Sequence, residues 1–450
     1  MFFQKVYAEW LAHYSYIFGD GYQAAVIDPR RDVDTYLQIA AAQGVQITHI
    51  FETHRHEDFV IGSVELAQRT GAQVHHAPEP GLEYRYGTPV QDGETFYIAR
   101  LALRALHVPG HTLGHMGYLL HDPGGAAWVF FSGDTLFAGE VGRTDFFGVE
   151  RMREMAGLLF DSLHQRILPL GDEVLLCPAH GAGSVCGSAI SERLWTTIGL
   201  ERKHNPRLQI LERDTFIESV ARVLGTPPYF ALVERLNVEG APVLEPFPLP
   251  TPLSPRQFRA EMVKAQVIDV REEPAFGAAH IPGAWSMYSR TLSNFTGWFL
   301  EPGTPILLVA DEERLDAAVR QLVRLGYDHI AGYLSGGMPA WLQDGLEVAA
   351  IPVIQPAGLK HRIYGGEDAW FLDVRREEEK AGQGVLQVPH VQSIVLSAIL
   401  QRAAEVPRQR PVYVICRTSA RAMLAASLLE PLGYNNLNVV AGGVAGWFAN

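Results

Sequence analysis

Apolar residues in the first 240 positions follow two alternating patterns. Short runs of β-branched and aromatic residues predict buried strands, and stretches with an apolar residue every three or four positions predict helices. The clearest predicted strands are residues 24–27, 47–51, 128–131 and 174–176, and the clearest predicted helices are residues 33–42 and 152–163. This alternation predicts an α/β domain in which helices cover a sheet.

The second half of the chain contains an internal repeat. Each copy opens with a predicted apolar strand that ends in Asp-Val-Arg, at 267–271 and 371–375, and continues with Leu-Gly-Tyr, Gly-Gly and a tryptophan. Each copy also pairs an apolar strand with an amphipathic helix: 306–309 with 313–325, and 412–415 with 420–432. This order predicts two α/β domains, each with a parallel sheet flanked by helices.

Length and composition agree with three globular domains. The chain has 450 residues, of which 47% are hydrophobic, and that length exceeds what one core usually supports. Proline-rich stretches at 242–255 and 351–358 favour extended linkers. We therefore predict boundaries near 245 and 355. The predicted domains are residues 1–245, 252–350 and 356–450.

Charge and cysteine content narrow the range of functions. The formal net charge of −13 disfavours nucleic acids and anionic membranes as partners and favours small molecules. The first residues lack the pattern of a signal peptide and no segment has the length of a membrane span, so we expect a cytoplasmic protein. Three cysteines, Cys177, Cys186 and Cys416, are too few for a disulfide framework and favour a reducing compartment.

Six potential metal ligands follow predicted strands of the first domain. They are His54, His56 and Asp58 in one His-x-His-x-Asp motif, and His111, Asp134 and His180 in three later loops. In an extended loop the three alternate residues of the motif point to one side. Imidazole and carboxylate donors favour Zn²⁺, Fe²⁺ or Mn²⁺ over Ca²⁺ or a thiolate-bound metal. The sequence therefore predicts a metal site.

This order of ligands resembles the metallo-β-lactamase superfamily over about the first 240 residues, which implies an αββα sandwich. In the dinuclear hydrolases of that superfamily, a histidine that binds a second metal follows the Asp of the motif, whereas this chain has Phe59. Because phenylalanine cannot coordinate a metal, one metal per chain is favoured. The alternative is a glyoxalase II-like zinc enzyme that hydrolyses a thioester with metal-bound hydroxide.

Within the superfamily, the chain resembles persulfide dioxygenases, also through Val-Gly-Arg-Thr-Asp-Phe at 141–146. The resemblance implies one Fe(II) held by His54, His111 and Asp134, with open positions for a persulfide sulfur and O₂. It also implies oxidation of the terminal sulfur to sulfite with release of a thiol. A recombinant sample could carry zinc instead. The remaining ligands would orient the metal-binding residues or form a second site: His56, Asp58 and His180.

Arg143 and Cys186 are further candidates near this site. Arg143 either binds an anionic part of the substrate or acts as a structural hydrogen-bond hub. Cys186 follows His180 in a glycine-rich turn, where a small buried hydrophobe is as compatible as a reactive thiol. In the fused dioxygenases that the chain resembles, a cysteine at this place carries sulfur, which implies the same for Cys186. Cys177 lies in an apolar strand and is expected in the core.

The second repeat has a cysteine between a strand and a helix. Cys416 directly follows the strand at 412–415. A helix N-terminus with Arg417 and Arg421 nearby lowers the pKa of a thiol, which predicts a nucleophilic Cys416 near neutral pH. The motifs of residues 360–450 resemble rhodanese sulfurtransferases, which implies that Cys416 carries a persulfide. Arg421 and the loop would hold that anion: Arg417, Thr418, Ser419 and Ala420.

The first repeat lacks these groups. At equal spacing before the Gly-Gly pair, Ala310 stands in place of Cys416 and Leu315 in place of Arg421, so we predict an inactive rhodanese-like domain. The whole chain is similar to bacterial fusions of a persulfide dioxygenase with rhodanese domains. This implies low-molecular-weight persulfides, O₂, sulfite and thiosulfate as reactants, and leaves a homo-oligomer open. A non-catalytic sulfur carrier or sensor is a further alternative.

Overall fold

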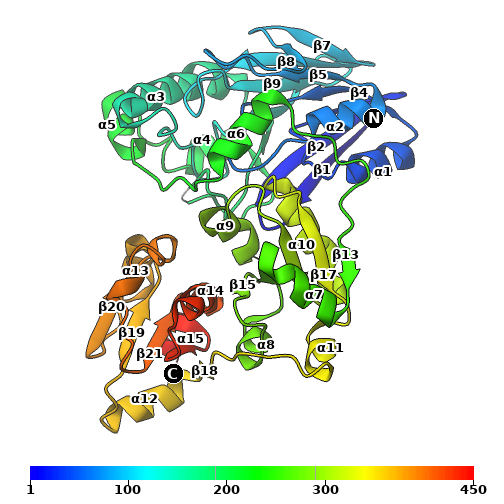
Figure 1. Ribbon diagram of the computed structural model, residues 1–450. Coiled ribbons are helices and arrows are strands. Elements are labelled where there is room, and N and C mark those ends of the chain that lie inside the picture. Colours follow the sequence, from blue (N-terminus) through cyan, green and yellow to red (C-terminus); the bar gives the residue numbers. More distant parts are fainter. Residues whose placement is uncertain (188, 289, 450) are drawn as a thin grey trace. The chain divides into compact units, whose positions relative to one another are not determined.

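The computed structural model describes residues 1–187, 189–288 and 290–449, which form two compact units (Figure 1). The first unit comprises Met1–Phe247 and Val323–Gly326, and the second comprises Pro248–Leu322 and Tyr327–Asn450. Among the described residues, none of the helices combines the length and apolar character that a membrane crossing needs.

Two six-stranded sheets form the first unit, within the residues that the structure describes. The first sheet contains β1 Phe2–Ala8, β2 His13–Asp20, β3 Gln23–Ile27, β4 Gln46–Phe51, β5 Gln73–His76 and β6 Thr88–Pro89, in that order. The second contains β7 Thr95–Ile98, β8 Leu101–His107, β9 Met116–His121, β10 Ala127–Gly133, β11 Leu175–Pro178 and β12 Thr196–Thr197, in the order β12-β11-β10-β9-β8-β7.

The two sheets pack face to face around one apolar core. Phe18 and Phe51 of the first sheet and Leu103 and Phe131 of the second are fully buried in this core. Cys177 of β11 belongs to the same cluster, as predicted. Because side chains alternate across a strand, the neighbours of these residues point to the outer faces, which therefore need covers of their own.

Helices cover both outer faces. Their bounds are α1 Asp34–Gln43, α2 Ser63–Thr70, α3 Val149–Asp161, α4 Ile198–His204, α5 Arg213–Val220 and α6 Phe230–Glu239, with short turns η1 Ser162–Ile167 and η2 Leu168–Leu170. Tyr36 of α1 and Leu66 of α2 pack on the first sheet. Leu159 of α3 and Phe216 of α5 pack on the second. This arrangement confirms the predicted αββα sandwich.

The second unit contains two five-stranded parallel sheets of the same strand order, counted over the described ranges. The first repeat consists of β13 Thr251–Leu253, α7 Pro255–Glu261, η3 Met262–Lys264, β14 Gln266–Asp269, α8 Glu273–Ala278, β15 Trp285–Ser286, α9 Arg290–Phe299, β16 Ile306–Val309, α10 Glu312–Arg324, β17 Ile330–Leu334 and α11 Gly337–Gln343. Its sheet order is β13-β17-β16-β14-β15.

The second repeat follows the same plan. It consists of β18 Val353–Ile354, α12 Pro356–Tyr364, β19 Trp370–Asp373, α13 Glu377–Gln383, β20 His390–Ser393, η4 Leu396–Ala398, η5 Ala403–Glu405, β21 Val412–Ile415, α14 Ala420–Leu429, η6 Glu430–Leu432, β22 Leu437–Val440 and α15 Gly443–Phe448. Its sheet order, β18-β22-β21-β19-β20, matches the first repeat strand by strand, which confirms the internal repeat and its parallel sheets.

Two details of the predicted elements are wrong. The stretch at 351–358 is not only a linker, because β18 joins the sheet there and Pro356 begins α12, a position that proline favours. The strands of the Asp-Val-Arg motifs end at the Asp. Asp269 accepts hydrogen bonds from the backbone and guanidinium of Arg271, and Asp373 binds Arg375 in the same way, so each motif closes its strand with a buried ion pair.

Candidate functional site

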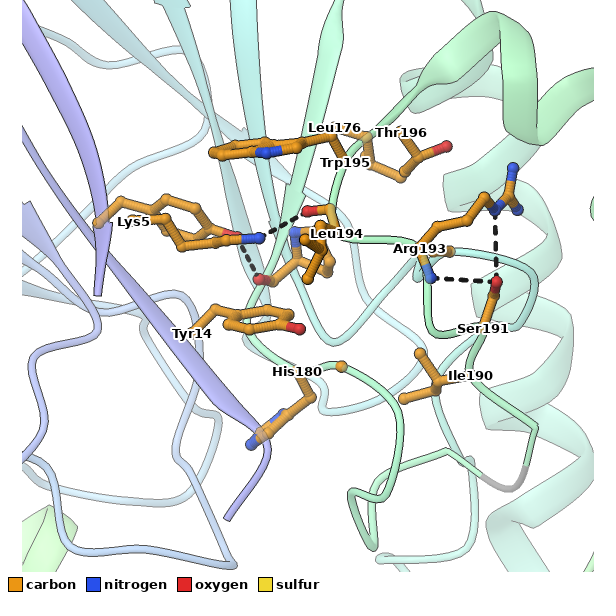
Figure 2. A pocket seen from close by; sticks show the side chains of 14 residues that line it. Lys5, Tyr14, Leu176, His180, Ile190, Ser191, Arg193, Leu194, Trp195 and Thr196 are labelled. Atoms are coloured by element: carbon orange, nitrogen blue, oxygen red, sulfur yellow. Dashed lines mark hydrogen bonds between the residues drawn. The ribbon is translucent and has the colours of Figure 1, made fainter. Parts of the chain in front are cut away.

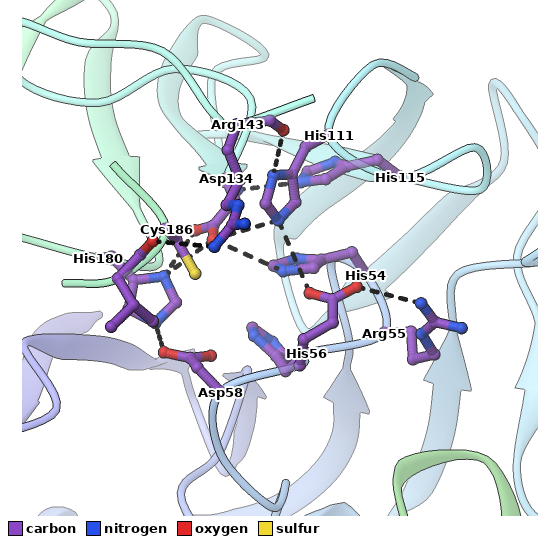
Figure 3. A network of polar contacts seen from close by, with 12 residues as sticks. His54, Arg55, His56, Asp58, His111, His115, Asp134, Arg143, His180 and Cys186 are labelled. Carbon is purple, nitrogen blue, oxygen red and sulfur yellow. Dashed lines mark hydrogen bonds and ion pairs between the residues drawn. The ribbon is translucent and has the colours of Figure 1, made fainter. Parts of the chain in front are cut away.

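His54, His111 and Asp134 converge in the first unit (Figure 3). His54 follows β4, His111 lies between β8 and β9, and Asp134 follows β10. Oδ2 of Asp134 lies 3.7 Å from Nε2 of His54 and 3.5 Å from Nε2 of His111. All three side chains are buried. Three strand ends thus bring two imidazole nitrogens and one carboxylate oxygen together.

Hydrogen bonds fix which ring nitrogen of each histidine faces this centre. The Thr53 hydroxyl donates to Asp28 (2.8 Å), so its 2.9 Å contact with Nδ1 of His54 has the imidazole as donor. Nδ1 of His111 donates to the carbonyl oxygen of Arg143 at 3.0 Å. With the proton on Nδ1, each Nε2 directs a lone pair at Asp134, which is how metal-binding histidines are commonly oriented.

The protonation of this centre favours a cation. Burial and the neighbouring histidines lower the pKa of His54 well below its ordinary value, and burial lowers the pKa of His111. Burial opposes ionisation of Asp134, but the charge and hydrogen bond of His180 lower the pKa of Asp134 below its usual range. Neutral imidazoles and a carboxylate are the metal-binding forms of these groups.

The unpaired ring nitrogens of this centre also fit a metal ion. Nε2 of His54 and Nε2 of His111 are buried and have no hydrogen-bond partner among the described residues. Leaving such atoms unpaired in the interior costs free energy. A divalent cation of the type bound by nitrogen and oxygen donors would satisfy both nitrogens and Asp134 together.

A second group lies beside the first and contains Asp58, His180 and Cys186, with one donor atom of each within 4.8 Å of the others. His180 lies between two carboxylates, with Nδ1 2.7 Å from Asp134 and Nε2 3.0 Å from Asp58. Burial opposes its charge, yet Asp134 and Asp58 raise the pKa of His180 well above its ordinary value. Burial and the same carboxylates raise the pKa of the Cys186 thiol.

The predicted convergence of the whole His-x-His-x-Asp motif on one point is wrong. His54 belongs to the first group and Asp58 to the second, while Nε2 of His56 lies 3.2 Å from Asp28. The physical reason is that the chain bends at residues 53–54 and 57–59 and is not extended. Phe59 is buried against the rings of His13 and His56, with centroids 4.0 and 4.5 Å away.

Arg143 has structural partners for its guanidinium. It binds both oxygens of Asp145 at 2.7 and 2.8 Å and donates to the carbonyl oxygen of Leu224 at 3.0 Å. These contacts favour the structural role, and substrate binding by Arg143 stays a prediction. Arg143 and Cys186 also line a pocket of about 360 Å³ that opens to solvent and includes Arg207 and Arg222.

A second pocket, of about 300 Å³, adjoins the backbone of His180 (Figure 2). The Lys5 amine lies over the rings of Tyr14 and Trp195 at 4.3 and 4.1 Å and donates to the carbonyl oxygen of Leu194. Figure 2 shows the imidazole of His180 pointing away from this pocket. The pocket is therefore separate from the two groups of potential metal ligands.

Cys416 lies in the second unit, between β21 and α14, and is fully buried. Its thiol accepts hydrogen bonds from the backbone N–H groups of Thr418, Arg421 and Ala422. The Arg421 guanidinium lies beside it. Burial nevertheless raises the pKa of the Cys416 thiol above its ordinary value. The predicted net lowering of this pKa is wrong, because desolvation outweighs the donors.

Glu379 holds Arg421 in place. The two guanidinium nitrogens of Arg421 lie 2.7 and 2.6 Å from the carboxylate oxygens of Glu379 in α13. Burial opposes the Glu379 charge, but Arg421 lowers the pKa of Glu379 to about 2. The other predicted loop residues are less buried: Arg417 and Thr418 are exposed, and Ser419 and Ala420 are partly exposed.

Local backbone contacts explain why the second repeat has glycine at position 443 of its Gly-Gly pair. Gly443 has φ 55°, and a Cβ atom there would lie 2.3 Å from the carbonyl oxygen of Cys416. At the matching place of the first repeat, Gly337 would meet the carbonyl oxygen of Ala310 at 3.9 Å. Ala310 follows β16 as Cys416 follows β21, so the two loops occupy the same strand end and only the second has a cysteine there.

Four residues of these sites are absent from the sequence prediction: Asp28, Glu57, His115 and Glu379. His115 stacks on His54 and its Nε2 accepts the N–H of Asp134 at 3.0 Å. Asp28 directly follows β3, so its strand-end position was a usable signal. Glu57 lies inside the His-x-His-x-Asp motif, where the assumption of an extended loop directs it away from the metal.

Comparisons with known proteins match both units. The family model described as the metallo-beta-lactamase superfamily matches residues 8–180, and the model described as a rhodanese-like domain matches residues 254–344 and 355–450. A metallo-beta-lactamase from Staphylococcus aureus subsp. aureus COL is similar in structure, with a TM-score of 0.66 and 30% sequence identity over 74% of this chain and 98% of that chain.

Two curated relatives have the same sequence identity to this chain. Hydroxyacylglutathione hydrolase GloC of Haemophilus influenzae is 30% identical over 43% of this chain and 91% of its own length. The mitochondrial persulfide dioxygenase ETHE1 of Bos taurus is 30% identical over 44% of this chain and 72% of its own length. Taken with the fold and the ligand groups, these matches mean that the chain belongs to the metallo-beta-lactamase superfamily, with two rhodanese-like domains following its metallo-beta-lactamase domain.

Proposed function

We propose that the chain is an Fe(II)-dependent persulfide dioxygenase joined to a sulfurtransferase. The observation that carries this proposal is the convergence of His54, His111 and Asp134 in a buried centre. Two imidazoles and one carboxylate on one side of a metal are typical of oxygen-activating iron sites. The rhodanese-like loop around Cys416 supports a second sulfur reaction in the same chain.

The overall oxidation balances without a further reductant. One persulfide, one O₂ and one water give one thiol, one sulfite and two protons. The sulfur–sulfur bond of the persulfide breaks, its terminal sulfur is oxidised, and O₂ is the only oxidant. Bound Fe(II) would supply the redox chemistry that joins O₂ to the terminal sulfur. His54, His111 and Asp134 would hold it, one Fe(II) per chain.

The residues of the chain orient this centre and keep it dry. Thr53 and the carbonyl oxygen of Arg143 hold the two imidazoles by their Nδ1 protons. His180 binds Asp134 and so directs its carboxylate, a support that commonly tunes a bound metal. Cys186 lines a pocket that opens to solvent, and its sulfur would there take the outer sulfur of a persulfide while the carrier thiol leaves.

The sulfurtransferase reaction belongs to Cys416. Its sulfur would attack the outer sulfur of thiosulfate, the sulfur–sulfur bond would break, and sulfite would leave with the electron pair. The resulting cysteine persulfide is an anion, and the N–H groups of the loop with Arg421 are donors of the kind that stabilise it. The same steps in reverse would join sulfur to sulfite and give thiosulfate.

A zinc thioester hydrolase is the second candidate. The similarity to a hydroxyacylglutathione hydrolase favours it, as does the second ligand group of Asp58, His180 and Cys186. A hydrolase of this type would bind two zinc ions and consume no O₂. It would use water in place of O₂ on a thioester carbonyl.

Metal analysis with two substrates separates these functions. The full chain is purified, its iron and zinc are counted, and each metal form is given glutathione persulfide or a glutathione thioester. The proposal expects about one iron per chain and turnover of the persulfide only. Two zinc ions per chain with turnover of the thioester only would establish the hydrolase and exclude the dioxygenase.

A further inference from the structure

Glu57 is a fully buried carboxylate whose two oxygens have different surroundings. Oε1 accepts a hydrogen bond from Arg55 at 3.3 Å. Oε2 has no hydrogen-bond partner among residues 1–187, 189–288 and 290–449. It lies 3.8 Å from Nε2 of His111, the nitrogen that also lies 3.5 Å from Asp134.

Three polar atoms thus gather at one buried point: Nε2 of His111, Oε2 of Glu57 and Oδ2 of Asp134. Nε2 of His111 carries a lone pair because Nδ1 holds the ring proton. Oε2 of Glu57 and Oδ2 of Asp134 both face that nitrogen, and burial raises the pKa of Glu57 well above its ordinary value. Acceptors gathered in a buried place repel one another, and the loss of their hydration is costly. A cation among them reverses the sign of these interactions.

We propose that Glu57 is a further residue of the metal centre, whose free carboxylate oxygen strengthens the binding of a divalent cation by His54, His111 and Asp134. The inference rests on the proposed metal centre and is independent of whether the ion is iron or zinc. Pairing with Arg55 explains only one oxygen of Glu57. The orientation of the other toward His111 is explained by a positive charge in the centre.

Glu57→Gln tests the proposal with a matched control. The amide keeps the size of the side chain and its contact with Arg55 but removes the negative charge. Glu234→Gln is the control, because Glu234 also lies near Arg55, at 3.5 Å, and is partly exposed. We expect Glu57→Gln to bind Co²⁺ and Zn²⁺ about tenfold or more weakly in competition with a chromophoric chelator, and Glu234→Gln to match the unchanged chain within about twofold.

Thermal unfolding of the metal-free chain gives a second readout. If Glu57 only supports the fold, Glu57→Gln will lower the melting temperature and leave metal affinity unchanged. The proposal expects the reverse: equal stability without metal, because the amide keeps the size of the buried side chain and its contact with Arg55, and a smaller gain when metal is added. Glu57→Asp, which keeps the charge on a shorter side chain, should lose less affinity than Glu57→Gln.

The outcomes distinguish this inference from the proposed function. Equal Co²⁺ affinity of Glu57→Gln and the unchanged chain, or equal loss in Glu57→Gln and Glu234→Gln, would overturn the role of the free oxygen while leaving the metal centre intact. Failure of the unchanged chain to bind either Co²⁺ or Zn²⁺ would instead refute the metal centre itself.

Discussion

The centre around Asp134 and the loop around Cys416 have opposite polarity. In the first, lone pairs of His54, His111 and Asp134 meet in a buried space. In the second, backbone N–H groups and the Arg421 guanidinium surround one sulfur atom. Both lie at strand ends, where parallel strands commonly present ligand sites. The comparison teaches that the groups at a strand end decide which ion it suits. Hydrogen-bond acceptors suit a cation, and hydrogen-bond donors suit an anion.

Burial has the opposite consequence for the reactive groups of the two sites. In the metal centre it lowers the pKa values of His54 and His111 and so keeps them in the form that binds a metal. In the loop it raises the pKa of Cys416 and so opposes formation of the thiolate. The loop donors therefore act fully only when an anion, such as a persulfide, is present.

Removal of one metal-binding nitrogen should have the largest effect on iron content and activity. His111→Ala deletes a nitrogen of the metal centre, so we expect iron content to fall from about one per chain to near zero and O₂ uptake with a persulfide to fall at least about a hundredfold. Thiosulfate sulfurtransfer should be unchanged, since that loop lies in the other unit. Elemental analysis and an oxygen electrode provide the measurements.

His204→Ala is the control for this variant, because His204 is an exposed histidine at the end of α4. It should keep its iron and its O₂ uptake. If His111→Ala retains both, the assignment of the three ligands is wrong.

Cys416→Ser removes the nucleophile and leaves the donors in place. We expect transfer of sulfur from thiosulfate to cyanide to fall at least about a hundredfold, because an unactivated hydroxyl is a far weaker nucleophile than a thiolate. O₂ uptake should stay within about twofold of the unchanged chain if the two sites act independently. Retention of the transfer activity would contradict the assignment of Cys416.

Arg421→Gln weakens the anion site without removing the sulfur, and a smaller effect is expected. With this charge gone, the pKa of Cys416 should rise further. The thiolate fraction, and with it the rate of alkylation by iodoacetamide, should fall about tenfold per unit of pKa at any pH below that value. In both forms the rate should increase with pH through and beyond the ordinary thiol range.

Arg417→Gln is the matched control, since Arg417 is exposed on the same loop. It should change the alkylation rate less than Arg421→Gln does. An equal decrease in both variants would show that general charge, and not the placement of Arg421 by Glu379, controls Cys416.

The sequence predicts the elements and the ligand types well, and the directions of the side chains poorly. Strands β16 and β21, and the position of Ala310 at the strand end that corresponds to Cys416, follow from apolar runs and fixed spacing, which are local properties. The bends that separate His54 from Asp58 depend on tertiary contacts. Glu57 was missed for that reason. The predicted direction of the pKa shift of Cys416 was wrong, because depth of burial is not a property of the local sequence.

One measurement tests the central claim most directly: the ratio of O₂ consumed to persulfide consumed by the full chain after anaerobic loading with Fe(II). The account predicts one O₂ per persulfide, with sulfite formed in equal amount before thiosulfate appears. Iron bound at the site without any O₂ uptake on addition of persulfide would contradict it.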